Sequence, residues 1–164
     1  MEKRFIVLDT ETTGLEVEKG HRIIEIGGVV MNGRKKTSET FHAYINPQRE
    51  IDKEAQAVHG ISNEDLEDKP FFSDIAEDFL EFIDGSTLVI HNADFDIGFL
   101  DAELKIASST YPAISDICEI KDTLAIARNK FPGQRNSLDA LSKRFEISGY
   151  DRSYHGALLD ANIL

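Results

Sequence analysis

The sequence predicts an α/β fold, in which a mixed sheet has helices packed on its faces. Three strand-like segments come first, and their short connections predict an antiparallel meander. Further strand-like segments then alternate with helical patterns, as expected where helices cover a sheet. With 164 residues, of which 41% are hydrophobic, the chain is long enough to bury one core. We therefore expect a single domain over residues 1–164.

The strands of the predicted meander are defined by apolar and β-branched runs. The first is Phe5–Leu8, a short apolar run typical of a strand buried on both faces. The second is Ile23–Val30, followed by Asn32-Gly33 as a hairpin turn. Alternation of apolar and polar residues predicts the third over Thr37–Ile45, and Asn46-Pro47 ends it.

Helical periodicity dominates the rest of the chain, with two further strands. Strands are predicted over Thr87–His91 and Ser115–Ile120. Helices are predicted over residues 53–58, 73–84, 92–107 and 122–130, and from 137, with a capping-box start at 62–65 and a last helix at the chain end. Because the chain stops four residues after Asp160, we expect that last helix to be truncated.

Composition limits the function classes. A formal net charge of −12 argues against a broad basic nucleic-acid-binding surface, but not against a small metal-neutralised site. The single cysteine, Cys118, excludes a disulfide framework, and no apolar segment resembles a signal or a membrane span, so we expect a cytoplasmic protein. Residues 51–84 are strongly acidic and form a candidate partner surface. Residues 125–144 are basic, either as a solvated helix face or as a rim that steers a polyanion.

Two carboxylates, Asp9 and Glu11, follow the first predicted strand. Side chains at i and i+2 of an extended segment leave a sheet on the same side, so the two converge. Residues 12–14 are expected to end the strand, which puts both acids at its carboxyl end, where α/β sheets bind ligands. Adjacent acids beside a buried strand repel each other unless a cation neutralises them. A solvent-exposed strand end is the alternative interpretation of this motif alone.

A second acidic motif, residues 91–96, follows another buried strand at the same sheet edge. Asp96 shares a helical face with Phe99, Leu100 and Glu103, so it should point inward. Asp94 is better placed to cap the helix N-terminus, where free N–H groups attract a carboxylate. We therefore assign Asp96 to the site and Asp94 to the cap.

The end of the chain contributes Asp160 and His155. Asp160 shares a helical face with small and apolar residues, which predicts close approach of that helix to a site that accepts charge. His155 lies just before the helix, where a histidine alone is most often a surface or capping residue. Beside four converging acids, we interpret it as functional.

Four carboxylates without a thiolate form an all-oxygen site for two Mg²⁺ or Mn²⁺ ions about 4 Å apart. Such a pair stabilises both the attacking and the leaving oxygen of an in-line phosphoryl displacement. His155, with an unperturbed pKa of about 6.5, suits a general base that takes a proton from water. The residues therefore predict metal-assisted hydrolysis of a phosphodiester.

Three ordered motifs resemble those of the DEDDh 3′→5′ exonucleases: Asp9-Thr-Glu11-Thr-Thr-Gly14, His91-Asn-Ala-x-Phe-Asp96 and His155-x4-Asp160. Within that superfamily the chain is similar, nearly end to end, to the family of epsilon (proofreading) subunits of bacterial DNA polymerase III. The resemblance implies a ribonuclease-H-like mixed five-stranded sheet with helices on both faces. It also implies release of nucleoside 5′-monophosphates from single-stranded DNA 3′ ends, proofreading during replication, and a replicative DNA polymerase subunit as partner.

The resemblance implies a role for each matching residue. Asp9 would bind both metal ions, Glu11 and Asp160 would complete the tighter site, Asp96 would support the second ion, and His155 would be the general base. Six residues would contact substrate: Thr12, Leu15, Glu54, His59, Asn92 and Phe95. Without the resemblance, Glu54 and His59 are ordinary helix-surface residues. Leu15 and Phe95 are equally interpretable as core.

Two alternatives stay open. Ribonuclease T and oligoribonuclease resemble the chain in the same motifs, so an RNA 3′-end exonuclease is the nearest. A non-catalytic polymerase-associated scaffold is disfavoured, because all four acids and the histidine are present.

Asp94 occupies the variable position of the second motif, where its charge would weaken the approach of phosphate.

Overall fold

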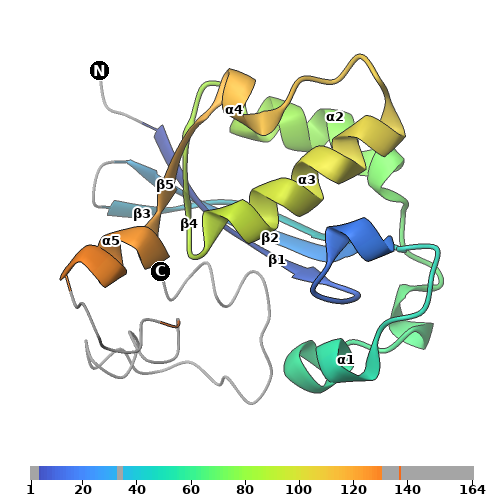
Figure 1. The fold of residues 1–164 in the computed structure, drawn as a ribbon. Helices are drawn as coiled ribbons and strands as arrows, with labels where there is room; N and C mark the ends of the chain where they lie inside the picture. Colours follow the sequence, from blue (N-terminus) through green and yellow to red (C-terminus); the bar gives the residue numbers. More distant parts are fainter. Residues whose placement is uncertain (1–3, 33–34, 131–136, 138–164) are drawn as a thin grey trace.

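In the computed structural model the chain forms a mixed five-stranded sheet with helices packed against it (Figure 1). The structure describes residues 4–32, 35–130 and 137. The strands are β1 (Arg4–Thr12), β2 (Ile23–Asn32), β3 (Lys35–Tyr44), β4 (Thr87–Ile90) and β5 (Glu119–Asp122). Their order is β3-β2-β1-β4-β5, with β2 antiparallel to both neighbours and β1, β4 and β5 parallel. The predicted fold class, with its initial meander, is confirmed.

The helices also agree with the prediction to within two residues at most ends. They are α1 (Lys53–His59), α2 (Phe72–Ile83), α3 (Ala93–Ala107), α4 (Ile114–Ile117) and α5 (Thr123–Lys130), with 3₁₀ turns η1 (Val17–Lys19) and η2 (Glu64–Leu66). Ser62 and Asp65 form the expected capping box, since each side chain accepts the other's backbone N–H. None of the described helices has both the length and the apolar character needed to span a membrane.

The strand predicted over Ser115–Ile120 is wrong in its first half, where the chain forms α4. The carboxylate of Asp101 accepts the N–H of Ile114 at 2.9 Å, and Ile114 is fully buried, so tertiary contacts begin a helical turn there. Only from Glu119 does the chain pair with β4. The predicted turn at Gly33, the helix predicted beyond Ser137 and the final helix lie outside the described residues.

The two faces of β1 have different surroundings. Ile6 and Leu8 point into the main core, together with residues of β2 and buried faces of α2 and α3, among them Phe79 and Phe99. Val7 points to the opposite face, into a small cluster with Val29, Met31 and Val89. Because side chains alternate along a strand, Thr10 continues the core side, whereas Asp9 and Glu11 continue the Val7 side.

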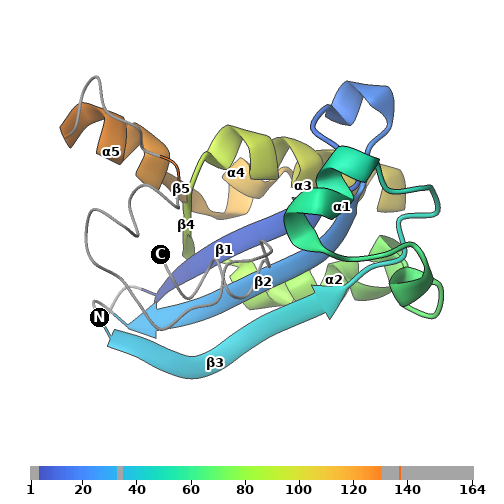
Figure 2. The same cartoon turned by 90° about the horizontal axis from the view of Figure 1, so that it is seen from below.

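β1 is longer than expected and carries both acids within it. β4 pairs only with Phe5, Ile6 and Val7 of β1, whereas β2 pairs with β1 as far as Thr12. Among the described residues, the segment with Asp9 and Glu11 is therefore paired on one side only. Both views of the fold place α1 near this carboxyl end of β1 (Figures 1 and 2).

Candidate active site

Asp9 and Glu11 lie on the same face of β1, as predicted, and both are partly exposed. In the strand register Asp9 is opposite Gly27, which adds no side chain beside it. Glu11 is opposite Glu25, a buried acid whose carboxylate lies 2.6 Å from Nε2 of His42. Like charges that face each other across two strands are destabilising, so the contact with His42 offsets part of this cost.

Asp96 reaches the same segment of β1 from the first turn of α3. The hydroxyl of Thr10, the residue between Asp9 and Glu11, donates a hydrogen bond to the Asp96 carboxylate. Asp96 is buried, as are Phe99, Leu100 and Glu103 on the same helix face, so the predicted inward orientation is confirmed. Burial raises the pKa of Asp96 to about 7, although the bond from Thr10 acts in the opposite direction.

The assignment of Asp94 to the helix cap is wrong. The N-cap of α3 is Asn92, in a left-handed conformation with φ of 66°, and Asp94 is an exposed residue inside the first turn. The N–H of Asn92 donates at 2.9 Å to the Asp122 carboxylate, which also accepts the N–H of Leu124 at the start of α5. The turn after β4 is thus held by β5, and it starts the helix at Ala93, before Asp94.

The described acids fit a hard divalent cation in their donor chemistry. Asp9, Glu11 and Asp96 offer only carboxylate oxygens, the ligands that such cations prefer. Burial raises the pKa of Asp96 and so disfavours its ionised form, which a nearby cation would stabilise. Within the described part of the chain, no three aspartate, glutamate, histidine or cysteine side chains come close enough to hold a metal ion. The remaining predicted residues of the site, His155 and Asp160, lie outside the described residues.

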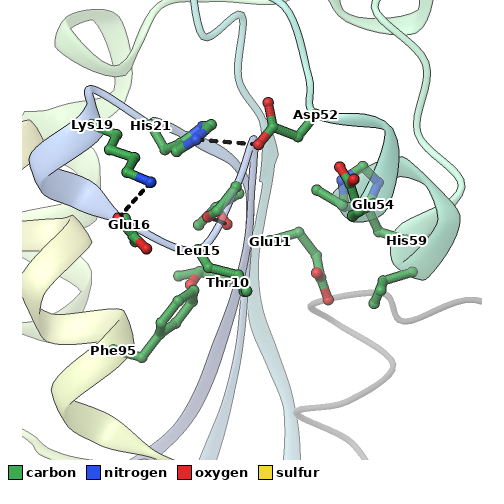
Figure 3. A pocket seen from close by; sticks show the side chains of 14 residues that line it. Thr10, Glu11, Leu15, Glu16, Lys19, His21, Asp52, Glu54, His59 and Phe95 are labelled. Carbon is green, nitrogen blue, oxygen red and sulfur yellow. Dashed lines mark hydrogen bonds and ion pairs between the residues drawn. The ribbon is translucent and has the colours of Figure 1, made fainter.

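A cleft of about 540 Å³ opens beside Glu11 (Figure 3). Its lining comes from the end of β1, the segment that follows it, α1 and the first turn of α3: Thr10, Glu11, Thr12, Gly14, Leu15, Glu16, Lys19, His21, Asp52, Glu54, Ala55, Val58, His59 and Phe95. Five of the six residues predicted to contact substrate are among them, and Asn92 is not. The structure thus brings these five together with Glu11.

The α1 wall of the cleft carries Glu54 and His59 (Figure 3). Glu54 is exposed, whereas His59 is buried. The interpretation as a helix-surface residue therefore holds for Glu54 and is wrong for His59. Nδ1 of His59 accepts the N–H of Ile61 at 3.0 Å, so in the neutral ring the proton is on Nε2. α1 ends immediately afterwards at Gly60, whose φ of 71° suits a glycine.

The opposite wall carries two apolar side chains with different surroundings. Leu15 is 81% exposed, so its interpretation as a core residue is wrong. Phe95 is partly buried and packs on Phe99, with ring centroids 5.0 Å apart. An exposed leucine at the edge of a cleft is a suitable surface for a flat, apolar part of a ligand.

Sequence reasoning missed several charged residues near the site. His21 lies 3.3 Å from the Asp52 carboxylate, and both line the cleft. Glu25 could have been noticed, because it is the one charged residue in the otherwise apolar run Ile23–Val30. His21 and Asp52 gave no such signal, because their contact joins two loops that are far apart in the sequence.

The sequence profile of a family described as Exonuclease (RNase_T) matches residues 6–164. The chain is 52% identical over 165 residues to DNA polymerase III subunit epsilon of Salmonella typhimurium, covering 98% of this chain and 68% of that protein. With the subunit of the same name from Rickettsia prowazekii the identity is 53% over 161 residues, covering 98% and 70%.

Solved structures of exonucleases also match the fold of the chain. Exonuclease X in complex with 5′ overhanging duplex DNA matches with a TM-score of 0.73 and 29% identity, covering 97% of this chain and 85% of that chain. The nuclease domain of 3′hExo, a DEDDh family member bound to rAMP, matches with a TM-score of 0.81 over 99% of this chain and 88% of that chain. At 18% identity, the second match supports the fold alone.

Proposed function

Because the chain belongs to the exonuclease (RNase_T) family, we propose that it is a two-metal-ion 3′→5′ exodeoxyribonuclease that proofreads during DNA replication. Its substrate would be a single-stranded DNA 3′ end, and its products nucleoside 5′-monophosphates. One observation carries the proposal: Glu11, at the end of β1, shares a cleft with the α1 residues Glu54 and His59. An acid that can bind metal is thereby placed beside a cavity of about 540 Å³, large enough for a terminal nucleotide.

The metal-binding role is proposed for Asp9, Glu11, Asp96 and Asp160, with Mg²⁺ or Mn²⁺ as the two ions. When bound, the ions supply positive charge that stabilises the attacking and leaving oxygens of the phosphodiester. The hydroxyl of Thr10 holds the Asp96 carboxylate at this part of β1, on the side of the strand opposite to Asp9 and Glu11. We propose His155 as the general base that removes a proton from the attacking water.

The cleft residues would bind the terminal nucleotide. Thr12 would contact the 3′-hydroxyl through its backbone, and Glu54 would accept hydrogen bonds in the same pocket. His59 would complete the α1 wall of that pocket. Leu15 and Phe95 would be apolar surfaces against the last bases, and stacking on the Phe95 ring would contribute about 1–3 kcal/mol.

The named relatives suggest the partner. Proteins with 52–53% identity to this chain are subunits of DNA polymerase III, so a replicative polymerase subunit is the partner we propose. A replication protein of this kind would act in the bacterial cytoplasm. The exposed acidic residues of α2 and the preceding segment are a candidate surface for that contact, since they lie outside the cleft.

The test is digestion of a single-stranded DNA oligonucleotide labelled at its 5′ end, with Mg²⁺ or Mn²⁺ present. We expect the label to stay on products that shorten one nucleotide at a time, with release of mononucleotides and complete inhibition by EDTA. An RNA oligonucleotide of the same sequence is the matched comparison. Faster loss of the RNA would overturn the DNA assignment, and no shortening of either strand would overturn the nuclease assignment.

A further inference from the structure

His21 joins the two walls of the cleft (Figure 3). It lies between β1 and β2 in the sequence, and its side chain is buried, at 7% exposure. Nδ1 is 2.9 Å from the hydroxyl of Thr13, directly after β1, and Nε2 is 3.3 Å from the carboxylate of Asp52, directly before α1. One imidazole ring therefore contacts both the segment after β1 and the start of α1.

The ring position is fixed by packing as well as by polar contacts. A Cβ added at Gly14 would lie 2.3 Å from Cε1 of His21 and 2.5 Å from each ring nitrogen. Distances this short mean that the imidazole lies directly against the backbone of Gly14, so that no other residue fits there without displacing the ring. Leu15, the exposed apolar residue of the cleft, follows Gly14 in the chain.

The proton positions around His21 follow from its neighbours. The N–H of Arg22 donates to the Thr13 hydroxyl oxygen at 3.0 Å, so the hydroxyl hydrogen can point to Nδ1 of His21. The ring proton is then on Nε2, which faces the Asp52 carboxylate at 3.3 Å. The Thr13 hydroxyl thus has a partner on each side, and the other ring nitrogen faces a carboxylate.

The side chain of Asp52 contacts His21 and does not cap its own helix, α1. It occupies the N-cap of α1, a position where an aspartate side chain usually bonds to the first free N–H groups and contributes about 1 kcal/mol. Among the described residues, its carboxylate makes no such bond and meets His21 instead. Its backbone N–H also donates to the Thr13 carbonyl at 2.9 Å, so Asp52 binds the segment after β1 twice.

We propose that His21 is a positioning residue that, together with Asp52, holds α1 at a fixed separation from the segment after β1. That separation is the width of the cleft between Glu54 and His59 on one side and Thr12 and Leu15 on the other. The inference rests on the proposed function in one respect: the ligand whose fit depends on this width is the terminal nucleotide. His21 itself acts through α1 and does not take part in the chemistry.

The experiment compares His21→Ala, Asp52→Ala and their double variant in the full chain. Asp52→Asn is the conservative variant, because it removes the charge and keeps an amide oxygen that can face Nε2. Glu39→Ala is the matched control, since it removes the ion pair with Arg4, whose N–O distance is 3.1 Å and which lies away from the cleft. Four quantities are measured: amide hydrogen exchange over residues 53–59, the Kd of thymidine 5′-monophosphate, kcat and KM on single-stranded DNA, and the half-saturating metal concentration.

Both alanine variants should weaken mononucleotide binding and raise KM by about tenfold, and should lower kcat by less than about threefold. Exchange over residues 53–59 should accelerate, while the half-saturating metal concentration stays unchanged. Asp52→Asn should restore binding to within about threefold of the unaltered protein. The double variant should be no weaker than His21→Ala, because the two residues act through one contact.

Unchanged exchange and unchanged mononucleotide affinity in Asp52→Ala would overturn the inference, as would fully additive losses in the double variant. Asp52 keeps this test available if His21→Ala fails to fold, because the Asp52 side chain is 48% exposed and its loss does not open the core. If the unaltered protein neither cleaves DNA nor binds the mononucleotide, the proposed function fails. The exchange measurement then still tests the link between His21 and α1 by itself.

Discussion

The guanidinium of Arg22 makes two hydrogen bonds to the carboxylate of Glu103, at 2.6 and 2.7 Å. Arg22 directly precedes β2, and Glu103 lies on the buried face of α3, two turns after Asp96. Glu103 also accepts the N–H of Ile23 at 3.2 Å. This bidentate pair holds α3 against the sheet. It therefore also holds the position along β1 at which Asp96 meets Thr10.

Removing Arg22 should destabilise the protein more than removing Glu103. Arg22→Ala leaves the Glu103 carboxylate, which is 2% exposed, buried without its cation, at a cost of about 3–5 kcal/mol. Glu103→Ala leaves an arginine that is 21% exposed and can turn toward water. Urea unfolding of both variants measures the difference. Equal losses would mean that packing, and not the charge, dominates the contribution of this pair.

The metal-free protein should lose stability as the pH rises, because of Asp96. The pKa of this carboxyl is raised from 3.8 to about 7 by burial, so the folded state favours the protonated form. Its contribution is fully present below pH 3.8 and is lost as the pH rises through about 7. Asp96→Asn should remove this dependence and be the more stable protein at pH 8. Thermal unfolding in EDTA from pH 4 to 8 measures it.

Added Mg²⁺ or Mn²⁺ should reverse the order of the two proteins at pH 8. A bound cation stabilises the ionised carboxylate of Asp96, whereas the neutral amide of Asp96→Asn gains much less. The same unfolding series, repeated with metal, provides the control. If metal stabilises the unaltered protein no more than it stabilises Asp96→Asn, Asp96 is not a metal ligand.

Leu15→Ala should weaken substrate binding without changing stability. Leu15 is 81% exposed, so its truncation should change the free energy of unfolding by less than about 0.5 kcal/mol. Lost apolar contact with a base should cost up to about 1.5–3 kcal/mol of affinity for single-stranded DNA. Ile106→Ala is the matched control, since Ile106 is 64% exposed and does not line the cleft. Equal affinities of the two variants would remove Leu15 from the substrate contacts.

Asp9→Ala and His155→Ala should separate metal binding from proton transfer. Asp9→Ala should lose both Mn²⁺ affinity and cleavage, because the removed carboxylate is a proposed ligand of both ions. His155→Ala should keep Mn²⁺ affinity and lose about 10²–10⁴-fold in kcat, the usual contribution of a general base. Calorimetric titration with Mn²⁺ and rates from pH 6 to 8 measure the two effects. Normal cleavage by His155→Ala over that range would show that another group takes the proton.

Local patterns in the sequence predicted the elements that carry the acids. The i, i+3, i+4 and i+7 spacing of Asp96 with Phe99, Leu100 and Glu103 predicted a buried helix face, which the structure confirms. The i, i+2 spacing of Asp9 and Glu11 likewise predicted one strand face. Helices and strands place side chains on a given face at fixed intervals along the chain. The local sequence is therefore enough to predict which residues share a face.

Contacts between residues far apart in the sequence could not be predicted in this way. Arg22 and Glu103 are 81 residues apart, and Glu25 and His42 are 17 apart, so no periodicity relates the members of either pair. The burial of His59 has the same cause, since it depends on where the fold places α1. The cap assignment of Asp94 failed for a similar reason: the turn at Asn92, held by Asp122 of β5, had already begun the helix.

Gly14→Ala should disturb the cleft, whereas Gly98→Ala in α3 should stabilise the fold. The new methyl group at position 14 would lie 2.3 Å from Cε1 of His21, so the ring must leave the position where it meets Thr13 and Asp52. At Gly98 nothing lies within 4 Å of an added Cβ, and alanine in a helix interior gains about 0.8–1.0 kcal/mol over glycine. Urea unfolding gives both free energies. Since the two changes add the same single methyl group, a similar gain in stability for Gly14→Ala would mean that the His21 ring moves aside at no cost and does not fix the cleft.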